Sequence, residues 1–316
     1  MTATRGAGVV RLATRGSPLA LAQARIVAGL LEARHPGLRT EPVAVRTEGD
    51  RRAGEDLERI GGQGVFVKEV QVAVLDGRAD VAVHSAKDLP PDTPDGLLLA
   101  AVPERADPRD ALVGATLDAL APGALVATGS ARRRAQLANL RPDLGFVGLR
   151  GNMSTRLARA GDGTVAAVVA AAAALDRLGW GARVAERLSP LRCLPQVGQG
   201  ALALECREDD LACRELLAQI DVWGDHRALD AERAFLRALG AGCALPAGAL
   251  AQPADGGRLA LDGMLASGDG RVVVRARLVG DDAGALGRAL AGMLVHDRGA
   301  SSLPEWEQFD ARAVSA

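Results

Sequence analysis

The chain has 316 residues, more than one average domain, which predicts two or three domains. Hydrophobic residues make up 48% and charged residues 24%, a composition that supports packed cores and excludes wholesale disorder. The 38 basic and 39 acidic side chains leave a net charge of −1, which argues against a generally basic nucleic-acid binder.

The sequence also predicts where the protein is located and whether its cysteines are reduced. The longest strongly apolar run, Val165 to Leu175, is too short to span a bilayer, and no secretory signal is visible at the N-terminus. We therefore expect a cytoplasmic protein without membrane association. The four cysteines form no CxxC pair and no zinc-ligand spacing, so we expect free thiols and no metal. Only Lys68 and Lys87 are lysines, and the other basic residues are arginine. Short arginine runs therefore arise more often by chance in this sequence and are weaker evidence for a binding site.

The chain begins with a predicted strand, Val9–Ala13, and a helix that Ser17 caps and Pro18 opens. His35-Pro36-Gly37 ends this helix. The elements predicted next are a strand, a mobile glycine-rich loop, a helix, a strand and a second loop: Val43–Thr47, Asp50–Gly64, Val65–Leu75, Asp80–His84 and Ser85–Pro94.

The strand–turn–helix pattern then recurs. Strands are predicted at Ala124–Ala127, Phe146–Leu149 and Val165–Ala171, each followed by a helix: Ala131–Leu140, one from Ser154, and one through Leu178. This alternation predicts α/β domains with largely parallel sheets. The segments around Ser17 and Ser130 look alike, so two similar lobes are expected.

After Asp221 the pattern changes. The sequence predicts a helix, a hairpin and a closing helix: Ala228–Leu239, Leu259–Leu265 with Arg271–Val279, and Ala283–Val295. These elements indicate a separate small α+β domain. The polar tail from His296 is expected to be loosely ordered.

Several of the turns are suited to anions. Ser17 and Ser130 stand at helix N-termini, which attract anions, although ordinary capping is the more common explanation for such residues. Arg132-Arg133-Arg134 begins the second of these helices, where cations are disfavoured, which suggests binding of a multiply anionic ligand. Arg150 and Arg156 follow the next strand, at the same expected sheet edge. The alternative is a solvated arginine-rich face.

Two further segments could carry chemistry. Lys87 and Asp88 follow a strand, and a carboxylate beside a lysine is suited to acid–base work or to stabilising a cation. The alternative is a loop salt bridge of little consequence. Cys243 is surrounded by small residues, which leaves room for a covalent adduct, whereas most free cysteines are simply small buried hydrophobes.

As an ordered set, the motifs resemble the porphobilinogen deaminase (hydroxymethylbilane synthase) family. The matching segments run in the family's order across nearly the whole chain: Thr14-Arg15-Gly16-Ser17-Pro18-Leu19-Ala20, Gly64-Val65-Phe66-Val67-Lys68-Glu69, Val83-His84-Ser85-Ala86-Lys87-Asp88-Leu89-Pro90, Asp107-Pro108-Arg109-Asp110-Ala111, Thr128-Gly129-Ser130-Ala131-Arg132-Arg133, Leu149-Arg150-Gly151-Asn152, Val197-Gly198-Gln199-Gly200-Ala201 and Gly242-Cys243. Each motif alone is weak evidence, but the ordered set is specific.

The resemblance implies a fold of two α/β lobes like those of periplasmic binding proteins, plus a small C-terminal α+β domain. The implied domains are residues 1–103 with 200–220, 104–199, and 221–316. The chain would cross between the lobes near Val102-Pro103 and Gln199-Gly200, and these crossings would form a hinge. The family also suggests a monomer.

The resemblance further implies a transferase of tetrapyrrole biosynthesis. A dipyrromethane cofactor, held by a thioether to Cys243, primes a growing oligopyrrole chain. Four porphobilinogen molecules are added one at a time with loss of ammonia, and water then releases hydroxymethylbilane. Each porphobilinogen brings an acetate and a propionate, so the chain accumulates carboxylates that arginine forks and helix N-termini would neutralise.

The residue roles implied by the resemblance fall into three sets. Asp88, assisted by Lys87, would protonate the departing amine, stabilise the azafulvene-like cation and accept the proton lost after coupling. The cofactor would be held by Cys243, Arg132, Arg133, Arg150, Arg156, Ser130 and Lys87. The substrate would be bound by Arg15, Ser17, Arg150, Arg156, Arg177, Gln199 and Phe66, with Phe66 just beyond the mobile loop.

Three positions depart from the family pattern. Gln63 stands where many relatives carry lysine, Arg134 where an uncharged residue is common, and Ala241 where glycine is common. We assign no role to Arg134.

Two other classes of function remain as alternatives. A two-lobed binding protein would not explain Cys243 or the Lys87-Asp88 pair. An arginine-rich nucleic-acid binder fits poorly with the net charge and with 2% aromatic residues.

Overall fold

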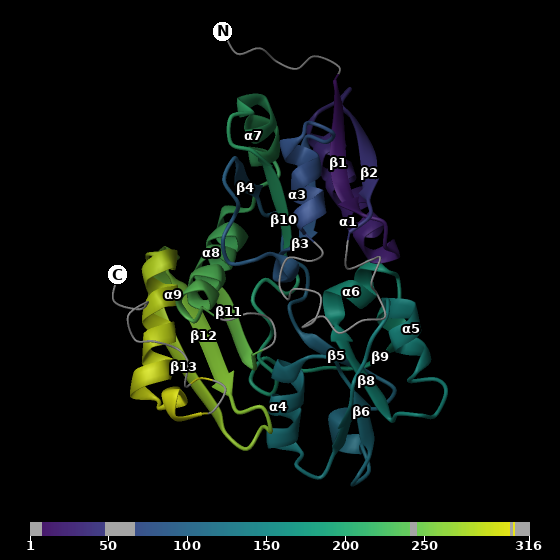
Figure 1. The fold of residues 1–316 in the computed structure, drawn as a ribbon, viewed down its shortest axis with the longest axis vertical. Helices are drawn as coiled ribbons and strands as arrows, with labels where there is room; N and C mark the ends of the chain where they lie inside the picture. Colours follow the sequence, from purple (N-terminus) through teal and green to yellow (C-terminus); the bar gives the residue numbers. More distant parts are fainter. Residues whose placement is uncertain (1–7, 48–66, 241–244, 304–305, 307–316) are drawn as a thin grey trace. The chain divides into compact units, whose positions relative to one another are not determined.

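A computed structural model describes residues 8–47, 67–240, 245–303 and 306 (Figure 1). Contacts divide the chain into two compact units, Met1–Ala106 with Ala201–His226 and Asp107–Gly200 with Arg227–Ala316. The chain therefore leaves the first unit after Ala106, returns at Ala201 and leaves again after His226. In the described part of the chain, no helix is both long and apolar enough to cross a membrane.

The first unit is built on a five-stranded sheet. Its strands are β1 (Val9–Arg15), β2 (Arg39–Val45), β3 (Val81–Ser85), β4 (Leu97–Ala101) and β10 (Leu202–Arg207), in the spatial order β2-β1-β3-β10-β4. β1 runs parallel to β2 and to β3, whereas β10 runs antiparallel to β3 and to β4.

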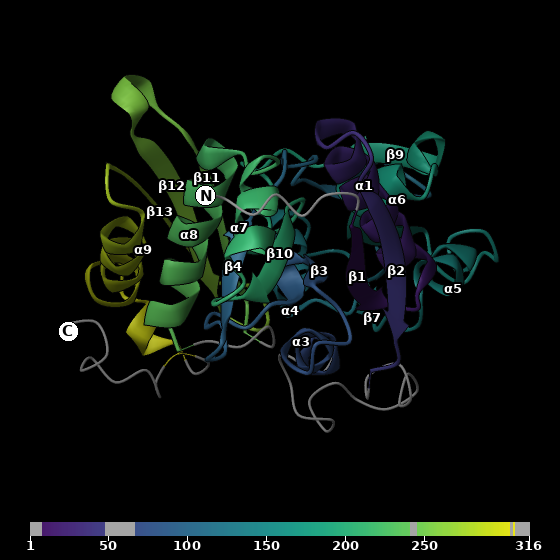
Figure 2. The ribbon, with the colours of Figure 1, turned by 90° about the horizontal axis from the view of Figure 1, so that it is seen from above.

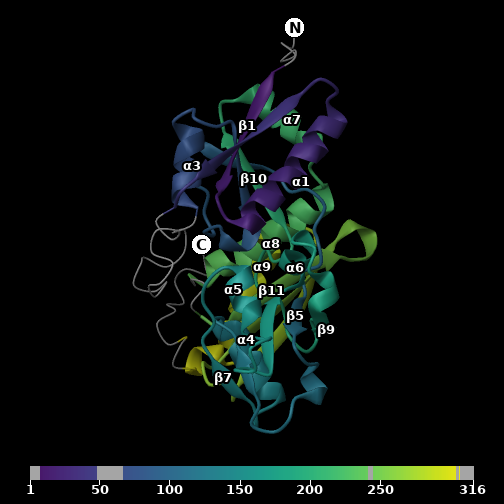
Figure 3. The same cartoon turned by 90° about the vertical axis from the view of Figure 1, so that its right-hand side faces the viewer.

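Helices cover both faces of this sheet. They are α1 (Pro18–Arg34), α3 (Lys68–Leu75) and α7 (Leu211–Ala218). Side chains of successive residues in a strand point to opposite faces. Leu12 of β1 accordingly packs in a cluster with α1 and α7, whereas Ala13 packs in another cluster with α3. Figures 2 and 3 show α1 and α3 on opposite faces of the sheet.

The second unit contains a sheet with the same topology. Its strands are β5 (Asp110–Val113), β6 (Leu125–Ala127), β7 (Gly145–Val147), β8 (Ala167–Ala171) and β9 (Val184–Arg187), in the order β7-β6-β8-β5-β9. The helices α5 (Met153–Ala158) and α6 (Ala172–Arg177) pack on one face, and α4 (Ala131–Leu140) packs on the other. Two lobes of one topology are the periplasmic-binding-protein-like architecture expected from the sequence.

The sheets are mixed, which corrects the expectation of largely parallel sheets. β6 runs parallel to β7 and β8, but β5 runs antiparallel to β8 and β9. A parallel pair needs a crossover, usually a helix, whereas antiparallel strands do not. The strand–helix alternation revealed only the strands that precede such helices. β5 and β10, which enter the sheets after the chain passes between units, were not predicted.

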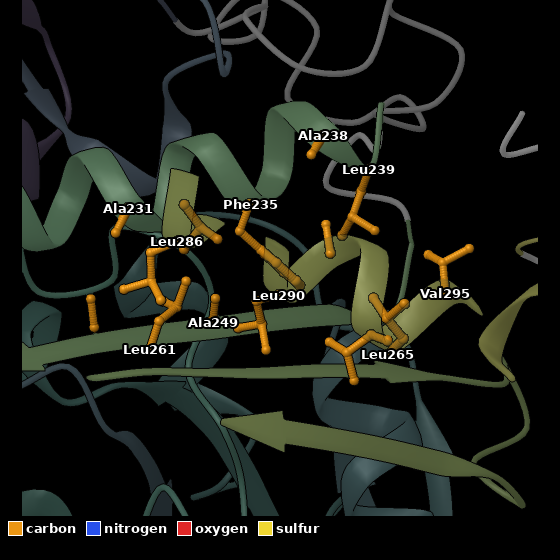
Figure 4. Packing of buried hydrophobic residues seen from close by; sticks show 14 of the residues in the cluster. Ala231, Phe235, Ala238, Leu239, Ala249, Leu261, Leu265, Leu286, Leu290 and Val295 are labelled. Atoms are coloured by element: carbon orange, nitrogen blue, oxygen red, sulfur yellow. The ribbon is translucent and has the colours of Figure 1, made fainter. Parts of the chain in front are cut away.

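A three-stranded antiparallel sheet completes the second unit. It comprises β11 (Ala247–Pro253), β12 (Leu259–Ala266) and β13 (Val273–Gly280), and α8 (Trp223–Ala238) and α9 (Ala283–Gly292) cover one face. Figure 4 shows Phe235 and Leu290 from these helices over Leu261 of β12. At Gly287 the helices lie so close that a Cβ would sit 2.5 Å from the carbonyl oxygen of Ala231. The predicted hairpin and both helices are confirmed.

Helix α4 is shared by two sheets of the second unit. Its Ala135 packs against Leu250 of β11 and Met264 of β12. On the same side, the Arg134 guanidinium donates to the carbonyl oxygen of Gly268 at 2.9 Å, and Asn139 donates to that of Gly270 at 3.0 Å. Arg134, which had no assigned role, thus binds the turn between β12 and β13. The small sheet is therefore anchored on α4.

Candidate active site

A pocket in the first unit lies where the parallel strands β1 and β3 end, at one edge of the sheet. Its lining comes mainly from these strand ends, the start of α1 and the turn after β3: Arg15, Ser17, Leu19, Ala20, Gln23, Val67, Val83, His84, Ser85 and Asp88. The structure thus brings the predicted residues Arg15, Ser17 and Asp88 together in one place.

The α1 side of the pocket is suited to an anion. The Ser17 hydroxyl accepts a hydrogen bond from the backbone N–H of Ala20 at 3.3 Å, and Pro18 occupies the first helical position. Ser17 therefore does cap the helix, and it also lines the pocket beside Arg15. A helix N-terminus and a guanidinium both favour negative charge. This side of the pocket fits a carboxylate.

Asp88 lies half-buried in a short 3₁₀ turn, Ala86–Asp88, directly after β3. Hydrogen bonds fix this turn at both ends: the Ala86 N–H donates to the carbonyl oxygen of Ala201 at 3.1 Å, and the Leu89 N–H donates to that of Ala86 at 3.2 Å. Lys87 is half-buried on the same turn but does not line the pocket. The turn holds the Asp88 carboxyl group at the pocket.

A buried polar network supports the pocket from the sheet. Glu205 of β10 lies with its Oε2 3.1 Å from His84 Nε2 and accepts a hydrogen bond from Gln71 Nε2 at 2.8 Å. His84, Glu205 and Gln71 are all buried. Gln23 of α1 donates to the Ser85 hydroxyl at 2.7 Å. Side chains from α1, α3, β3 and β10 thus form polar contacts beside the pocket that Asp88 lines.

The second unit presents its own anion-binding edge. Because β6 runs parallel to β7 and β8, the segments after these strands lie at one edge of the sheet. Ser130 caps α4 by accepting from the Arg133 N–H at 3.4 Å. A Cβ at Gly129 would lie 2.7 Å from the carbonyl oxygen of Leu149, so only glycine allows these two segments to approach so closely.

Arg132 and Arg133 converge on one carboxylate. Arg132 Nη2 lies 2.8 Å from Asp110 Oδ2, and Arg133 Nη2 lies 2.7 Å from Asp110 Oδ1. Gln199 Nε2 donates to Asp110 Oδ1 at 2.9 Å, and the Cys193 thiol contacts Oδ2 at 3.4 Å. Asp110 and Gln199 are 0% exposed and Arg132 only 3%. Gln199, predicted to bind substrate, thus contributes to this cluster.

Backbone carbonyls complete the cluster. Arg132 Nη1 donates to the carbonyl oxygen of Leu194, and Arg133 Nη1 donates to that of Val169 at 3.2 Å. The buried Nε of Arg132 has no hydrogen-bond acceptor among the residues that the structure describes. Two guanidiniums and one carboxylate leave the cluster with an excess positive charge.

The charges of the cluster fix its protonation state. Burial alone would raise the pKa of Asp110, but the positive charges of Arg132 and Arg133, with hydrogen bonds from Gln199 and Arg133, hold it well below its usual range. Burial and the Asp110 charge raise the pKa of Cys193 to about 12. Asp110 is therefore a carboxylate at neutral pH, and Cys193 is an unreactive thiol.

The remaining predicted arginines differ in exposure. Arg150 is exposed, and Arg156 is half-buried with its Nε donating to the carbonyl oxygen of Gly151 at 2.8 Å. Arg177 donates to the carbonyl oxygen of Gly200 at 2.7 Å, and burial lowers its pKa to about 10. Arg177 therefore remains a cation at neutral pH.

Sequence reasoning did not single out Asp110 or Glu205. Asp110 stood inside a quoted motif without a role, and Glu205 is an acidic residue in the apolar run 201–206, which is a signal for a buried ion pair. Phe66, Gln63, Ala241 and Cys243 lie outside the described residues. Within the described ranges, no group of three or more His, Cys, Asp or Glu side chains is placed to hold a metal ion.

Family comparisons cover most of the chain. Residues 10–215 match the family model "Porphobilinogen deaminase, dipyromethane cofactor binding domain", and residues 227–296 match "Porphobilinogen deaminase, C-terminal domain". The porphobilinogen deaminase of Syntrophobacter fumaroxidans is 45% identical over 302 residues, covering 94% of this chain and 97% of its own. The porphobilinogen deaminase of Syntrophus aciditrophicus is 43% identical over 295 residues, covering 92% of this chain and 96% of its own.

Solved structures resemble the chain more distantly. The VFT2 domain of Bordetella pertussis BvgS is 20% identical, with a TM-score of 0.38, covering 72% of this chain and 92% of that chain. The probable amino-acid ABC transporter extracellular-binding protein ytmK of Bacillus subtilis is 10% identical, with a TM-score of 0.37, covering 73% and 97%.

Proposed function

This chain belongs to the porphobilinogen deaminase family and is a hydroxymethylbilane synthase of tetrapyrrole biosynthesis, and we propose which of its residues carry that reaction. The observation that supports the assignment most is the convergence of Arg15, Ser17 and Asp88 in one pocket of the first unit. We assign the chemistry of each added porphobilinogen to this pocket and the binding of chain carboxylates to the arginine edge of the second unit.

Arg15 and Ser17 hold a carboxylate of the incoming porphobilinogen. A guanidinium offers two parallel N–H donors to a carboxylate, and the first turn of α1 adds the positive end of its dipole. With the acetate or propionate fixed in this way, the aminomethyl group of the substrate is presented to Asp88. Phe66 is assigned to the same substrate from the family pattern alone.

Asp88 handles the protons of the reaction. Its carboxyl group protonates the amine that leaves as ammonia, and the resulting carboxylate stabilises the cation that remains on the substrate. The same carboxylate accepts the proton lost from the carbon where the new bond has formed. Lys87 lies on the same turn and assists by binding carboxylates. The hydrogen bonds of the turn keep Asp88 in place through these steps.

The residues of the second unit fit the dipyrromethane cofactor of the family. The unpaired buried Nε of Arg132 and the exposed guanidinium of Arg150 offer donors to its acetate and propionate groups. Arg133, Arg156 and Ser130 belong to the same edge. When bound by a thioether to Cys243, the cofactor supplies the pyrrole carbon to which porphobilinogen is added.

Chain connectivity supports this placement. Gly248 of β11 lies so close to Arg132 that a Cβ on the glycine would be 3.1 Å from Arg132 Cδ. Cys243 precedes Gly248 by five residues in the sequence, a span of at most about 18 Å. A group attached to Cys243 is therefore tethered within reach of Arg132.

Arg177 and Gln199 are the remaining predicted substrate contacts. Arg177 keeps its cationic charge beside the carbonyl oxygen of Gly200, and Gln199 acts through Asp110. We further propose that the protein works in the cytoplasm as a monomer, on porphobilinogen and its oligomers, without nucleic acid or membrane. The three domains of this proposal are residues 1–103 with 200–220, 104–199, and 221–316.

The intact mass of the purified protein, beside a Cys243→Ser variant, tests the proposed anchor. We expect an excess mass equal to two linked pyrrole units that is absent from the variant, and further pyrrole-sized steps on incubation with porphobilinogen. A protein isolated without the excess mass should gain it from porphobilinogen or hydroxymethylbilane. If it gains nothing from either, the assignment of Cys243 is wrong.

A further inference from the structure

We propose that Asp110 is a positioning residue that orients Arg132 and Arg133 and sets the charge that they present to the carboxylates of the cofactor. The proposal rests on the roles given above to the two arginines. Asp110 does not contact the ligand in this scheme, because its carboxylate is fully buried among its own partners.

The geometry shows how one carboxylate fixes two long side chains. Asp110 Oδ2 pairs with Arg132, and Oδ1 accepts from both Nε and Nη2 of Arg133, at 2.9 and 2.7 Å. Arginine side chains have many rotamers, and ordering them costs conformational entropy. Asp110 directs both guanidiniums before any ligand arrives, so this cost is met during folding rather than during binding.

The charge of the cluster argues for a ligand. Two adjacent guanidiniums are buried against a single carboxylate, and the Cys193 thiol in contact with it is neutral because its pKa is raised to about 12 by burial. One positive charge is therefore uncompensated within the cluster. A buried charge without a partner is unfavourable, so a carboxylate at the unpaired Nε of Arg132 would stabilise the site.

A second layer holds Asp110 itself. Gln199 donates to Asp110 Oδ1 and to the carbonyl oxygen of Pro108 at 2.7 Å, and its own carbonyl accepts from Arg133 Nη2 at 3.3 Å. The Gln199 amide thus links the carboxylate to the backbone two residues earlier and to one of the arginines. Side chains fixed in this way hold a binding geometry within tight limits.

The test is cofactor loading by apoprotein, followed by intact mass rather than by activity. Apoprotein from cells that cannot make porphobilinogen is mixed with hydroxymethylbilane, and the fraction carrying the dipyrromethane mass is measured over time. For Asp110→Asn, which is isosteric, we expect loading to slow by about ten- to a hundredfold, as expected when binding groups shift by about an ångström. We expect Asp110→Glu, which moves the charge by one methylene, to load slowly as well.

Asp107→Asn is the matched control. Asp107 lies in the same segment but pairs with Arg109 and Arg187, at 2.8 Å each, rather than with the arginines of α4. We expect this variant to load at the rate of the unaltered protein. Equal slowing in both variants would mean a general loss of structure and would overturn the proposal.

Two further outcomes separate this inference from the site assignment on which it rests. Arg132→Gln should fail to load. If Arg132→Gln loads normally, the role of Arg132 toward the cofactor is wrong, and the inference fails with it. If Arg132→Gln fails but folded Asp110→Asn loads at the normal rate, only the inference about Asp110 is overturned. Should Asp110→Asn not fold, normal loading by Asp110→Glu overturns it instead.

Discussion

Glu205 Oε2 lies 3.1 Å from His84 Nε2, and both side chains are buried. Glu205 also accepts from Gln71 of α3, so one carboxylate joins three elements behind the Asp88 pocket. Removing this carboxylate is costly, because Gln71 Nε2 would be left buried without its acceptor.

We therefore expect Glu205→Ala to destabilise the protein by about 1–3 kcal/mol, the usual cost of leaving a buried hydrogen-bonding group unsatisfied. Urea unfolding followed by circular dichroism measures this loss. Glu208→Ala, three residues along on an exposed position, is the control and should change stability by less than about 0.5 kcal/mol. A similar small effect for both variants would show that the pair contributes nothing net.

Asp88→Asn should keep the fold and lose most turnover. The amide retains the size of the side chain but neither donates an acidic proton nor accepts one, and such groups contribute about 10²- to 10⁴-fold in rate. Formation of hydroxymethylbilane and the melting temperature are measured together. Asp95→Asn, exposed in the loop that follows, serves as the control and should leave the rate unchanged. Near-normal turnover in Asp88→Asn would remove Asp88 from the mechanism.

The stability that Asp110 contributes to the folded protein should decrease as the pH falls. Its pKa is lowered in the folded protein by Arg132 and Arg133 against the effect of burial, so its stabilisation is complete above the unfolded value of about 3.9. As the pH falls below about 5, protonation of the unfolded chain removes this contribution progressively. The difference in melting temperature between Asp110→Asn and the unaltered protein should therefore be constant from pH 7 to 5.5 and shrink at lower pH. A difference that grows in acid would contradict the assignment.

Gly287 should tolerate no side chain. A Cβ there would lie 2.5 Å from the carbonyl oxygen of Ala231 and 2.6 Å from the backbone nitrogen of Phe235, so α8 and α9 would have to separate. Gly287→Ala is expected to cost about 1–3 kcal/mol, measured by calorimetry. Gly284→Ala in the same helix meets only flexible side-chain ends and should be neutral or stabilising. Equal melting temperatures for the two variants would contradict this contact.

The elements with local signals could be predicted from the sequence. α4 has the predicted bounds, Ala131–Leu140, because Ser130 caps it and its apolar spacing is helical. α1 begins at Pro18 for the same kind of reason. The strands β4, β5, β9, β10 and β11 were missed. Two of them, Leu97–Ala101 and Leu202–Arg207, are short runs without alternation, which periodicity does not assign to a strand.

The residues of the site that face the ligand could be predicted from the sequence, but the residues that hold them in position could not. Arg132 and Arg133 were predicted because cations are electrostatically disfavoured at a helix N-terminus, and their presence there suggests that they bind an anionic ligand. Their partner Asp110 lies on a strand that was not predicted, and pairing between distant segments depends on the tertiary fold. The same holds for Arg134, whose acceptor on Gly268 lies more than a hundred residues further along the chain.

The position of β10 in the first sheet has a consequence for synthesis on the ribosome. β10 lies between β3 and β4, yet it follows the end of β4 by about 100 residues. Because the ribosome adds about 5–20 residues per second, β10 is synthesised roughly 5–20 seconds after β4. The lobe that begins first during translation is therefore completed only after residues 107–200 have been made, and the edges of β3 and β4 that β10 will cover stay unpaired until then.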